Sequence, residues 1–243
     1  MSQVPAQIST LSMRELRDDP LKLSIEIDQA FQSTGCFYLT DHGIRATAVT
    51  RAFERECSGL MKALLNVLDV SAAHLGLKVN KSLARCHTGS NFTFSCIHYP
   101  DVRARPRPVQ MATHQDISTA SFVFLDSTPG LQVADKGSTT EVTSSGVEQT
   151  ADFIPVMPVE TAIVVLTGFH MQRFVEEWSS AFHRVCIDHP AGSPALEPLE
   201  RYSIAFFAAA DEGTTISSQD GETFSVDESL CKNRKRIYRE VPA

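Results

Sequence analysis

The stretch RYSIAFFA, residues 201–208, alternates polar and apolar side chains in the way that a half-buried β-strand does. Successive side chains of a strand point to opposite faces, so Arg201 and Ser203 share one face and Tyr202 lies on the other. Six further runs after residue 85 are short and rich in aromatic or β-branched residues: Asn91–His98, Ser121–Asp126, Leu131–Ala134, Phe153–Val156, Thr161–Leu166 and Phe182–Ile187. Turn-forming residues interrupt these runs, and most of them have no helical pattern between them. The sequence therefore predicts a mainly β fold, an antiparallel sandwich or jelly roll, with a polar, mobile hairpin or loop at residues 135–150.

The first third of the chain has helical periodicity instead. Apolar residues recur at helical spacing over residues 23–31 and again over residues 49–68. Between these two predicted helices, Cys36–Thr40 has the composition of a short buried strand. We therefore predict a helical region with one strand at residues 1–84, packed on a β core at residues 85–243 in one structural unit.

Two of the eight histidines stand in patterns typical of metal ligands. His114 and Asp116 are two residues apart, so in an extended strand both side chains would face the same way and could reach one ion. His183 lies in another predicted strand, 67 residues beyond Asp116. Two imidazoles and one carboxylate occupy one face of an octahedral ion and leave three positions open, which is the non-haem Fe(II) arrangement. Zinc favours a tetrahedral site with thiolates or a third histidine, and this set supplies neither.

Arg201 and Ser203 form a second informative pair. Both face inward from a strand that is otherwise apolar, and an unpaired guanidinium is costly to bury. A carboxylate ligand, held by the guanidinium fork and the serine hydroxyl, would satisfy both side chains. An internal salt bridge to an aspartate or glutamate is the alternative explanation.

Four stretches, in order along the chain, resemble the motifs of one family. They are GCFYLTDHGI at residues 35–44, His98-Tyr99-Pro100, HQDIST at 114–119 followed by PGLQV at 129–133, and the pair His183-Arg184-Val185 and Arg201-Tyr202-Ser203. On these motifs the chain resembles the isopenicillin-N-synthase-like branch of the Fe(II)/2-oxoglutarate dioxygenases.

The resemblance implies a distorted double-stranded β-helix, a jelly-roll or cupin-like fold with flanking helices, and iron at the open end of the barrel. It implies that His114, Asp116 and His183 bind Fe(II), with 2-oxoglutarate and O₂ as cosubstrates. It further implies three side chains for the distal carboxylate of 2-oxoglutarate: Arg201, Ser203 and Tyr99. Three phenylalanines are candidate walls of a substrate pocket: Phe207, which shares a strand face with Arg201 and Ser203, Phe124 and Phe169.

The same resemblance predicts an enzyme that oxidises an unactivated C–H bond of a small organic substrate, in specialised metabolism. Hydroxylation, desaturation, epoxidation and ring closure all remain open, because no residue in the sequence chooses among them. Two alternatives also remain. An oxidative cyclase of the isopenicillin N synthase type would use Arg201 and Ser203 for the carboxylate of its own substrate and need no 2-oxoglutarate. A non-catalytic jelly-roll binding protein is the other alternative.

The chain departs from the family pattern in three places, one of which is that Ile97 replaces the asparagine that often precedes the family's counterpart of His98-Tyr99-Pro100. The stretch between His42-Gly43 and His114 is shorter than usual in the family, and Asp188–Glu200 inserts a proline-rich loop before Arg201. The shortened stretch normally helps to wall the substrate pocket. We therefore expect a pocket that is unusually open or is completed by another subunit, which would make the protein a homo-oligomer.

Composition excludes several other classes of protein. A net charge of −7 argues against a nucleic-acid groove, which needs a concentrated basic surface. The strongest apolar run, residues 162–166, is far too short to cross a bilayer, and the N-terminus lacks the pattern of a secretory signal. The six scattered cysteines contain no CxxC pair and indicate reduced thiols. We therefore expect a cytoplasmic protein that binds a small molecule, with no nucleic-acid or membrane partner.

Overall fold

The computed structural model describes residues 8–19, 21, 24–43, 50–89, 91–100, 109–186, 200–217 and 221–232. Its α-helices are α1 (Met13–Asp18), α2 (Ser24–Ser33), α3 (Thr50–His74), α4 (Ser144–Thr150) and α5 (Met171–Phe174), and its short 3-10 helices are η1 (Ala84–Cys86) and η2 (Lys136–Ser138). Its strands are β1 (Ser9–Ser12), β2 (Cys36–Thr40), β3 (Phe92–Tyr99), β4 (Val109–His114), β5 (Ala120–Leu125), β6 (Leu131–Ala134), β7 (Phe153–Pro155), β8 (Ile163–Thr167), β9 (His183–Cys186), β10 (Arg201–Ala208), β11 (Thr215–Ser217) and β12 (Thr223–Ser225).

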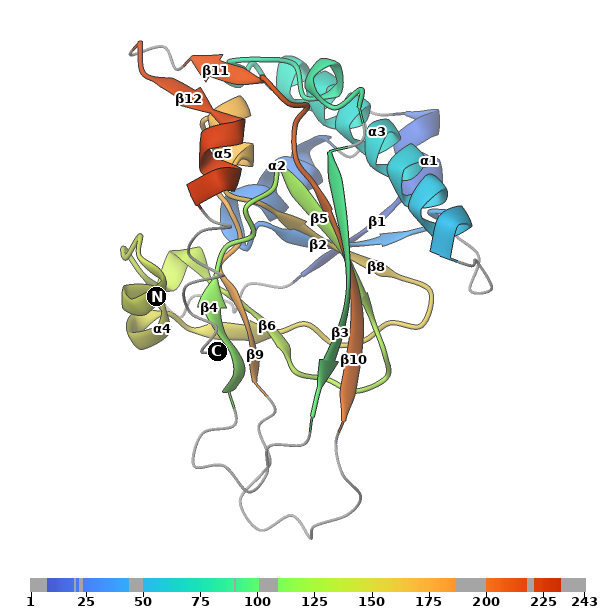
Figure 1. Ribbon diagram of the computed structural model, residues 1–243, viewed down its shortest axis with the longest axis vertical. Coiled ribbons are helices and arrows are strands. Elements are labelled where there is room, and N and C mark those ends of the chain that lie inside the picture. Colours follow the sequence, from blue (N-terminus) through green and yellow to red (C-terminus); the bar gives the residue numbers. More distant parts are fainter. Residues whose placement is uncertain are drawn as a thin grey trace, which may run out of the picture.

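The strands from β3 to β10 divide between two sheets. The large sheet has the order β1-β2-β8-β5-β10-β3, and the small sheet has the order β4-β9-β6-β7. Apart from β6 and β7, consecutive strands along the chain therefore lie in opposite sheets, and within each sheet these strands pair antiparallel. This winding is the double-stranded β-helix expected from the sequence, and Figure 1 shows the two sheets facing each other.

The large sheet separates two hydrophobic cores. Its outer face packs against α1, α2 and α3, and Phe122 and Phe206 from β5 and β10 lie in that core. Its inner face, with Val123 and Leu166, meets side chains of the small sheet such as Val185 inside the barrel. The N-terminal region contributes directly to this sheet, because β2 pairs with β8 and β1 pairs with β2.

Three predicted strands have the expected bounds, the other predicted strands are shifted by one or two residues at their ends, and one predicted loop is partly helical. The strands β2, β6 and β10 cover the predicted residues. The polar segment 135–150 is not a loop throughout, because it contains η2 and the helix α4. Thr143 caps α4, since its side chain accepts a hydrogen bond from the Gly146 N–H, and Val147 of α4 is buried in a small apolar cluster. The proline-rich loop predicted at Asp188–Glu200 lies outside the described residues except for Glu200.

No helix in the described ranges is both long and apolar enough for a bilayer span. All six cysteines fall within those ranges, and each is a free thiol.

Candidate metal centre

The two predicted histidine ligands lie side by side across the small sheet. His114 is the last residue of β4 and pairs with His183, the first residue of β9. The centroids of the two imidazole rings are 4.2 Å apart. His183 is buried, whereas the His114 side chain is 30% exposed. One histidine of the pair therefore lies deep in the barrel and the other lies nearer its rim.

Asp116 is brought to the histidines by a loop and not by the strand that the sequence predicted. The strand β4 ends at His114, and Gln115 and Asp116 have no regular secondary structure. The backbone of the next loop holds Asp116 in place, because the Phe169 N–H donates to the Asp116 carbonyl at 2.7 Å. Asp116 Oδ1 then lies 3.7 Å from His114 Nε2 and 3.6 Å from His183 Nε2. The two residues predicted from their spacing thus lie close together, but through a different local geometry.

The three side chains fit a metal ion. One ligand atom from each lies within 4.8 Å of the others. The Nδ1 atoms of His114 and His183 are 2.9 and 3.1 Å from the carbonyls of Ala112 and Ala181. A carbonyl only accepts hydrogen bonds, so each Nδ1 carries the proton and each Nε2 offers its lone pair to the cluster. Asp116 Oδ2 is buried without a hydrogen-bond partner in the described chain, which leaves a carboxylate oxygen for an ion.

Arg201 and Ser203 face the interior of the barrel, as the alternation in β10 predicted. They are 1% and 3% exposed, whereas Tyr202 between them is 52% exposed. Arg201 Nε and Nη1 and Ser203 Oγ have no hydrogen-bond partner among the described residues. Tyr99 lies opposite Arg201 in the β3–β10 ladder, and the guanidinium carbon is 4.8 Å from the centre of the Tyr99 ring.

The charge of Arg201 is only partly compensated by the residues that the structure describes. Burial lowers the pKa of the Arg201 guanidinium below its ordinary value, and the neighbouring Tyr99 hydroxyl and the Asp126 carboxylate act in the opposite direction. No carboxylate in the described ranges forms an ion pair with Arg201, so the internal salt bridge considered from the sequence is not found there. A guanidinium buried in this way favours an anionic ligand.

One cavity of about 100 Å³ connects the cluster with this pair. It is lined by His114, Asp116, His183, Arg201, Ser203, Tyr99 and Phe207, together with Ile97, Met111, Val123, Leu131, Leu166, Val185 and Ala205. Phe207 thus lies where its strand face predicted. The apolar lining residues were not predicted from the sequence. The two-residue period of a strand could have identified two of them, because Val185 shares a face with His183 and Ala205 shares a face with Ser203.

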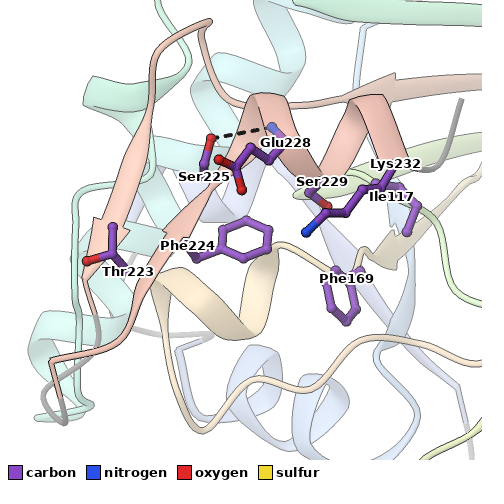
Figure 2. A pocket seen from close by; sticks show the side chains of 8 residues that line it. All are labelled: Ile117, Phe169, Thr223, Phe224, Ser225, Glu228, Ser229 and Lys232. Carbon is purple, nitrogen blue, oxygen red and sulfur yellow. Dashed lines mark hydrogen bonds between the residues drawn. The ribbon is translucent and has the colours of Figure 1, made fainter. Parts of the chain in front are cut away.

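The other two predicted pocket residues lie elsewhere. Phe124 does not line this cavity, because its side chain packs against the core on the outer face of the large sheet. Phe169 lines a separate pocket of about 410 Å³ beside β12 and the helical residues 226–232, which Figure 2 shows. There it lies near the ring of Phe224, with Ile117 and Lys232 on the same wall. Phe124 therefore faces away from the cavity of the cluster, and a role for Phe169 in a substrate pocket stays a prediction.

Comparison with known proteins gives one family match. The model of the 2OG-Fe(II) oxygenase superfamily matches residues 86–210, which is about half of the chain. A curated relative, the proline hydroxylase buaE of Petromyces alliaceus, is 27% identical over 196 residues, covering 78% of this chain and 55% of its own. The chain thus spans about half the length of that relative.

Solved structures share the fold. A full-length Neurospora crassa protein in complex with alpha-KG superposes with a TM-score of 0.74 at 15% identity, covering 96% of this chain and 97% of the other. The same Neurospora crassa protein has also been solved with alpha-KG and thymine. The rice dioxygenase for auxin oxidation has a TM-score of 0.67 at 16% identity, covering 98% and 97% of the two chains. At these identities the likeness shows a common architecture that includes the N-terminal helices.

Proposed function

Because this chain belongs to the 2OG-Fe(II) oxygenase superfamily, we propose that it is a dioxygenase that oxidises a C–H bond of a small organic substrate. The family match, the fold shared with structures that contain alpha-KG and the His-Asp-His cluster support Fe(II) and 2-oxoglutarate as its cofactors, with O₂ implied. The observation that carries the proposal is the close approach of His114, Asp116 and His183 at one end of a cavity that also contains Arg201.

His114, Asp116 and His183 would hold the iron. Two neutral imidazoles and one carboxylate suit Fe(II) with open positions, and the described part of the cluster offers no thiolate that would favour zinc. Bound there, iron supplies the oxidising chemistry for an unactivated C–H bond, with 2-oxoglutarate and O₂ as its co-reactants. The protein contributes the fixed tautomers of His114 and His183, which keep both Nε2 lone pairs directed at one point.

Arg201, Ser203 and Tyr99 would hold the distal carboxylate of 2-oxoglutarate. The unpartnered guanidinium nitrogens and the serine hydroxyl are donors that a carboxylate accepts from. The apolar side chains around them exclude water, which strengthens these charged hydrogen bonds. With Phe207 and Val185 as walls, the cosubstrate would be enclosed between the arginine and the metal ligands.

The substrate is expected to lie largely beyond this cavity. Binding sites for small organic ligands usually measure several hundred Å³, and the cavity of about 100 Å³ is smaller than that even before the cosubstrate enters. The similar proteins are a proline hydroxylase, a protein solved with thymine and a dioxygenase for auxin oxidation, and proline, thymine and auxin are all small molecules. We propose a substrate of that size class that belongs to specialised metabolism. The net charge of −7 supports a small molecule over nucleic acid as the substrate. We also propose that the protein is cytoplasmic.

Anaerobic metal titration tests the proposal directly. Wild type is expected to bind Fe(II), and His114→Ala is expected to lose most of that affinity, while His74→Ala, at an exposed position near the end of α3, serves as the matched control. Adding 2-oxoglutarate to the Fe(II) protein should produce a metal-to-ligand charge-transfer band, and air should then release succinate. Fe(II) binding without the band or succinate would favour the 2-oxoglutarate-independent cyclase. Equal Fe(II) binding by wild type and His114→Ala would favour the non-catalytic binding protein.

A further inference from the structure

We propose that Glu148 of α4 is a positioning residue for the metal site, because it joins the neighbours of both histidine ligands from outside the barrel. Thr113 directly precedes His114, and Arg184 directly follows His183. The Glu148 carboxylate binds both of these neighbours, one through each oxygen. This inference rests on the proposed function, since it concerns how this chain holds that metal site.

On the β4 side, Glu148 satisfies a buried polar residue. Thr113 is 6% exposed and is not among the residues that line the cavity; its side chain meets Glu148 instead. Glu148 Oε2 accepts hydrogen bonds from the Thr113 hydroxyl and from the Thr113 backbone N–H, the latter at 3.3 Å. The carboxylate therefore fixes both the side chain and the backbone of the residue next to His114.

On the β9 side, Glu148 is one of three groups that fix a single guanidinium. Arg184 Nη1 donates to Glu148 Oε1 at 2.7 Å, and Arg184 Nε donates to Gln132 Oε1 at 2.7 Å. The guanidinium also lies 3.7 Å from the centre of the Phe153 ring. The Arg184 side chain is 19% exposed and that of Glu148 is 33% exposed, so solvent screens this pair less than it would a fully exposed one.

The strand pairing beneath this bridge is irregular. The β4–β9 ladder has three partner pairs, Val109 with Cys186, Met111 with Val185 and His114 with His183, with a shift of register between each. A ladder of this kind constrains the relative position of the two strands less than a regular one does. The cross-link through Glu148 lies next to the His114–His183 pair and supplies a constraint that the backbone lacks.

The helix α4 is a firm support for the carboxylate. Thr143 caps its first turn, and Val147, the neighbour of Glu148, is 1% exposed in an apolar cluster with Ala134 and Phe182. A side chain held on a packed helix can position a neighbouring site more precisely than one on a mobile loop. The segment that connects β6 and β7 thus has a role in the geometry of the metal site.

Co(II) binding, which needs neither substrate nor O₂, tests this inference. We expect Glu148→Ala and Thr113→Val to weaken Co(II) affinity by about tenfold or more, as loss of groups that orient ligands typically does. Both variants should also change the visible Co(II) spectrum, because that spectrum reports ligand geometry. Thr113→Ser keeps the hydroxyl and should restore affinity. Glu141→Ala removes an exposed charge from the same connection and should match wild type.

The outcomes separate this inference from the proposed function. If Glu148→Ala and Thr113→Val lower the melting temperature but keep wild-type Co(II) affinity and spectrum, Glu148 is only structural and the inference is overturned. If Glu148→Ala does not fold, the Thr113 pair and Glu148→Gln decide in the same way. If wild type binds Co(II) no better than His114→Ala, the proposed function fails and this inference fails with it.

Discussion

At the scale of single residues, Arg201 combines 1% exposure with two guanidinium nitrogens that no described residue engages. Replacement by lysine keeps the charge but removes the planar fork that fits a carboxylate. We expect Arg201→Lys to raise the 2-oxoglutarate concentration needed for half-saturation by about 10- to 100-fold, from the strength of charged hydrogen bonds. Fe(II) affinity, measured in the same anaerobic titration, should stay within a few-fold of wild type. Equal loss of both affinities would show that the arginine is structural.

His170 allows a prediction about pH at the same scale. It is fully buried, and burial, with the nearby positive charges of His87 and Arg173, lowers its pKa to about 4. The unfolded chain binds the proton with the ordinary pKa of about 6.5, so stability is lost as pH falls from about 6.5 toward 4.

Urea unfolding at pH 7 and pH 5 checks this dependence. Wild type should lose about 2 kcal/mol more than His170→Gln between these two values, because the variant has no imidazole to protonate. Titrating groups that do not interact with His170 are common to both proteins and cancel in the difference. Parallel losses in the two proteins would contradict the prediction.

Residues whose role depends on local period could be predicted from the sequence. Arg201 and Ser203 follow from alternation along one strand, and that alternation survives in the fold because one face of β10 lines the cavity inside the barrel. Glu148 could not be predicted. Its role depends on where α4 packs relative to β4 and β9, and that is decided by tertiary contacts such as the burial of Val147.

At the scale of elements, two loops meet behind the proposed aspartate ligand. The N–H groups of Gly168, Phe169 and His170 donate to the carbonyls of Thr119, Asp116 and Ser118 at 3.0, 2.7 and 2.9 Å. Gly168 approaches so closely that an added Cβ would overlap the backbone of Ser118. A side chain at this position would therefore separate the two loops.

Gly168→Ala is expected to destabilise the protein by about 1–3 kcal/mol, the usual cost of overpacking. It should also weaken Fe(II) binding, because Asp116 would move with its loop. Gly59→Ala is the matched control. Gly59 lies in the middle of α3 at an exposed position, where an added Cβ meets open space, so the variant should stabilise the folded protein by about 0.5–1 kcal/mol. Chemical denaturation and anaerobic Fe(II) titration give both values. Unchanged Fe(II) affinity in a destabilised Gly168→Ala would mean that the loop contact does not position Asp116.

Elements with a strong apolar signal were predicted well, and polar ones were not. The strands β2, β6 and β10 have continuous or alternating apolar residues, so their burial is visible in the sequence. The helix α4 has the polar sequence SSGVEQT. It is stabilised by the Thr143 cap, by one buried valine and by the contacts of Glu148, none of which gives a helical period.

At the scale of the whole molecule, the large sheet is shared by the N-terminal region and the barrel. The helices α1–α3 cover its outer face, and the cluster of His114, Asp116 and His183 lies on its inner side. The core between them contains Phe31, Phe37 and Trp178, which are fully buried. Whether another subunit completes the substrate pocket stays a prediction, and sedimentation of the purified protein would test it.

Ligands that bind only the folded barrel should raise its thermal stability. At about 100 times its dissociation constant, a ligand adds about 2.7 kcal/mol to the stability of the folded state. For a chain of this length that corresponds to a rise in Tm of about 5–10 °C. We expect Co(II) with 2-oxoglutarate to produce this rise in wild type. In His114→Ala the rise in Tm should be mostly absent. If thermal unfolding showed the same rise in both proteins, the ligands would bind at a site that does not include His114.

The incomplete pairing of Arg201 has a consequence for how this chain can change over evolutionary time. A buried charge whose partner is supplied from outside makes the ligand-free protein less stable than an apolar residue of similar volume would. Arg201→Met should therefore raise the melting temperature of the ligand-free chain while it abolishes 2-oxoglutarate binding. Selection for stability alone would thus remove this arginine. A buried arginine beside Ser203 on the inner face of β10 is what the proposed binding of a carboxylate would require.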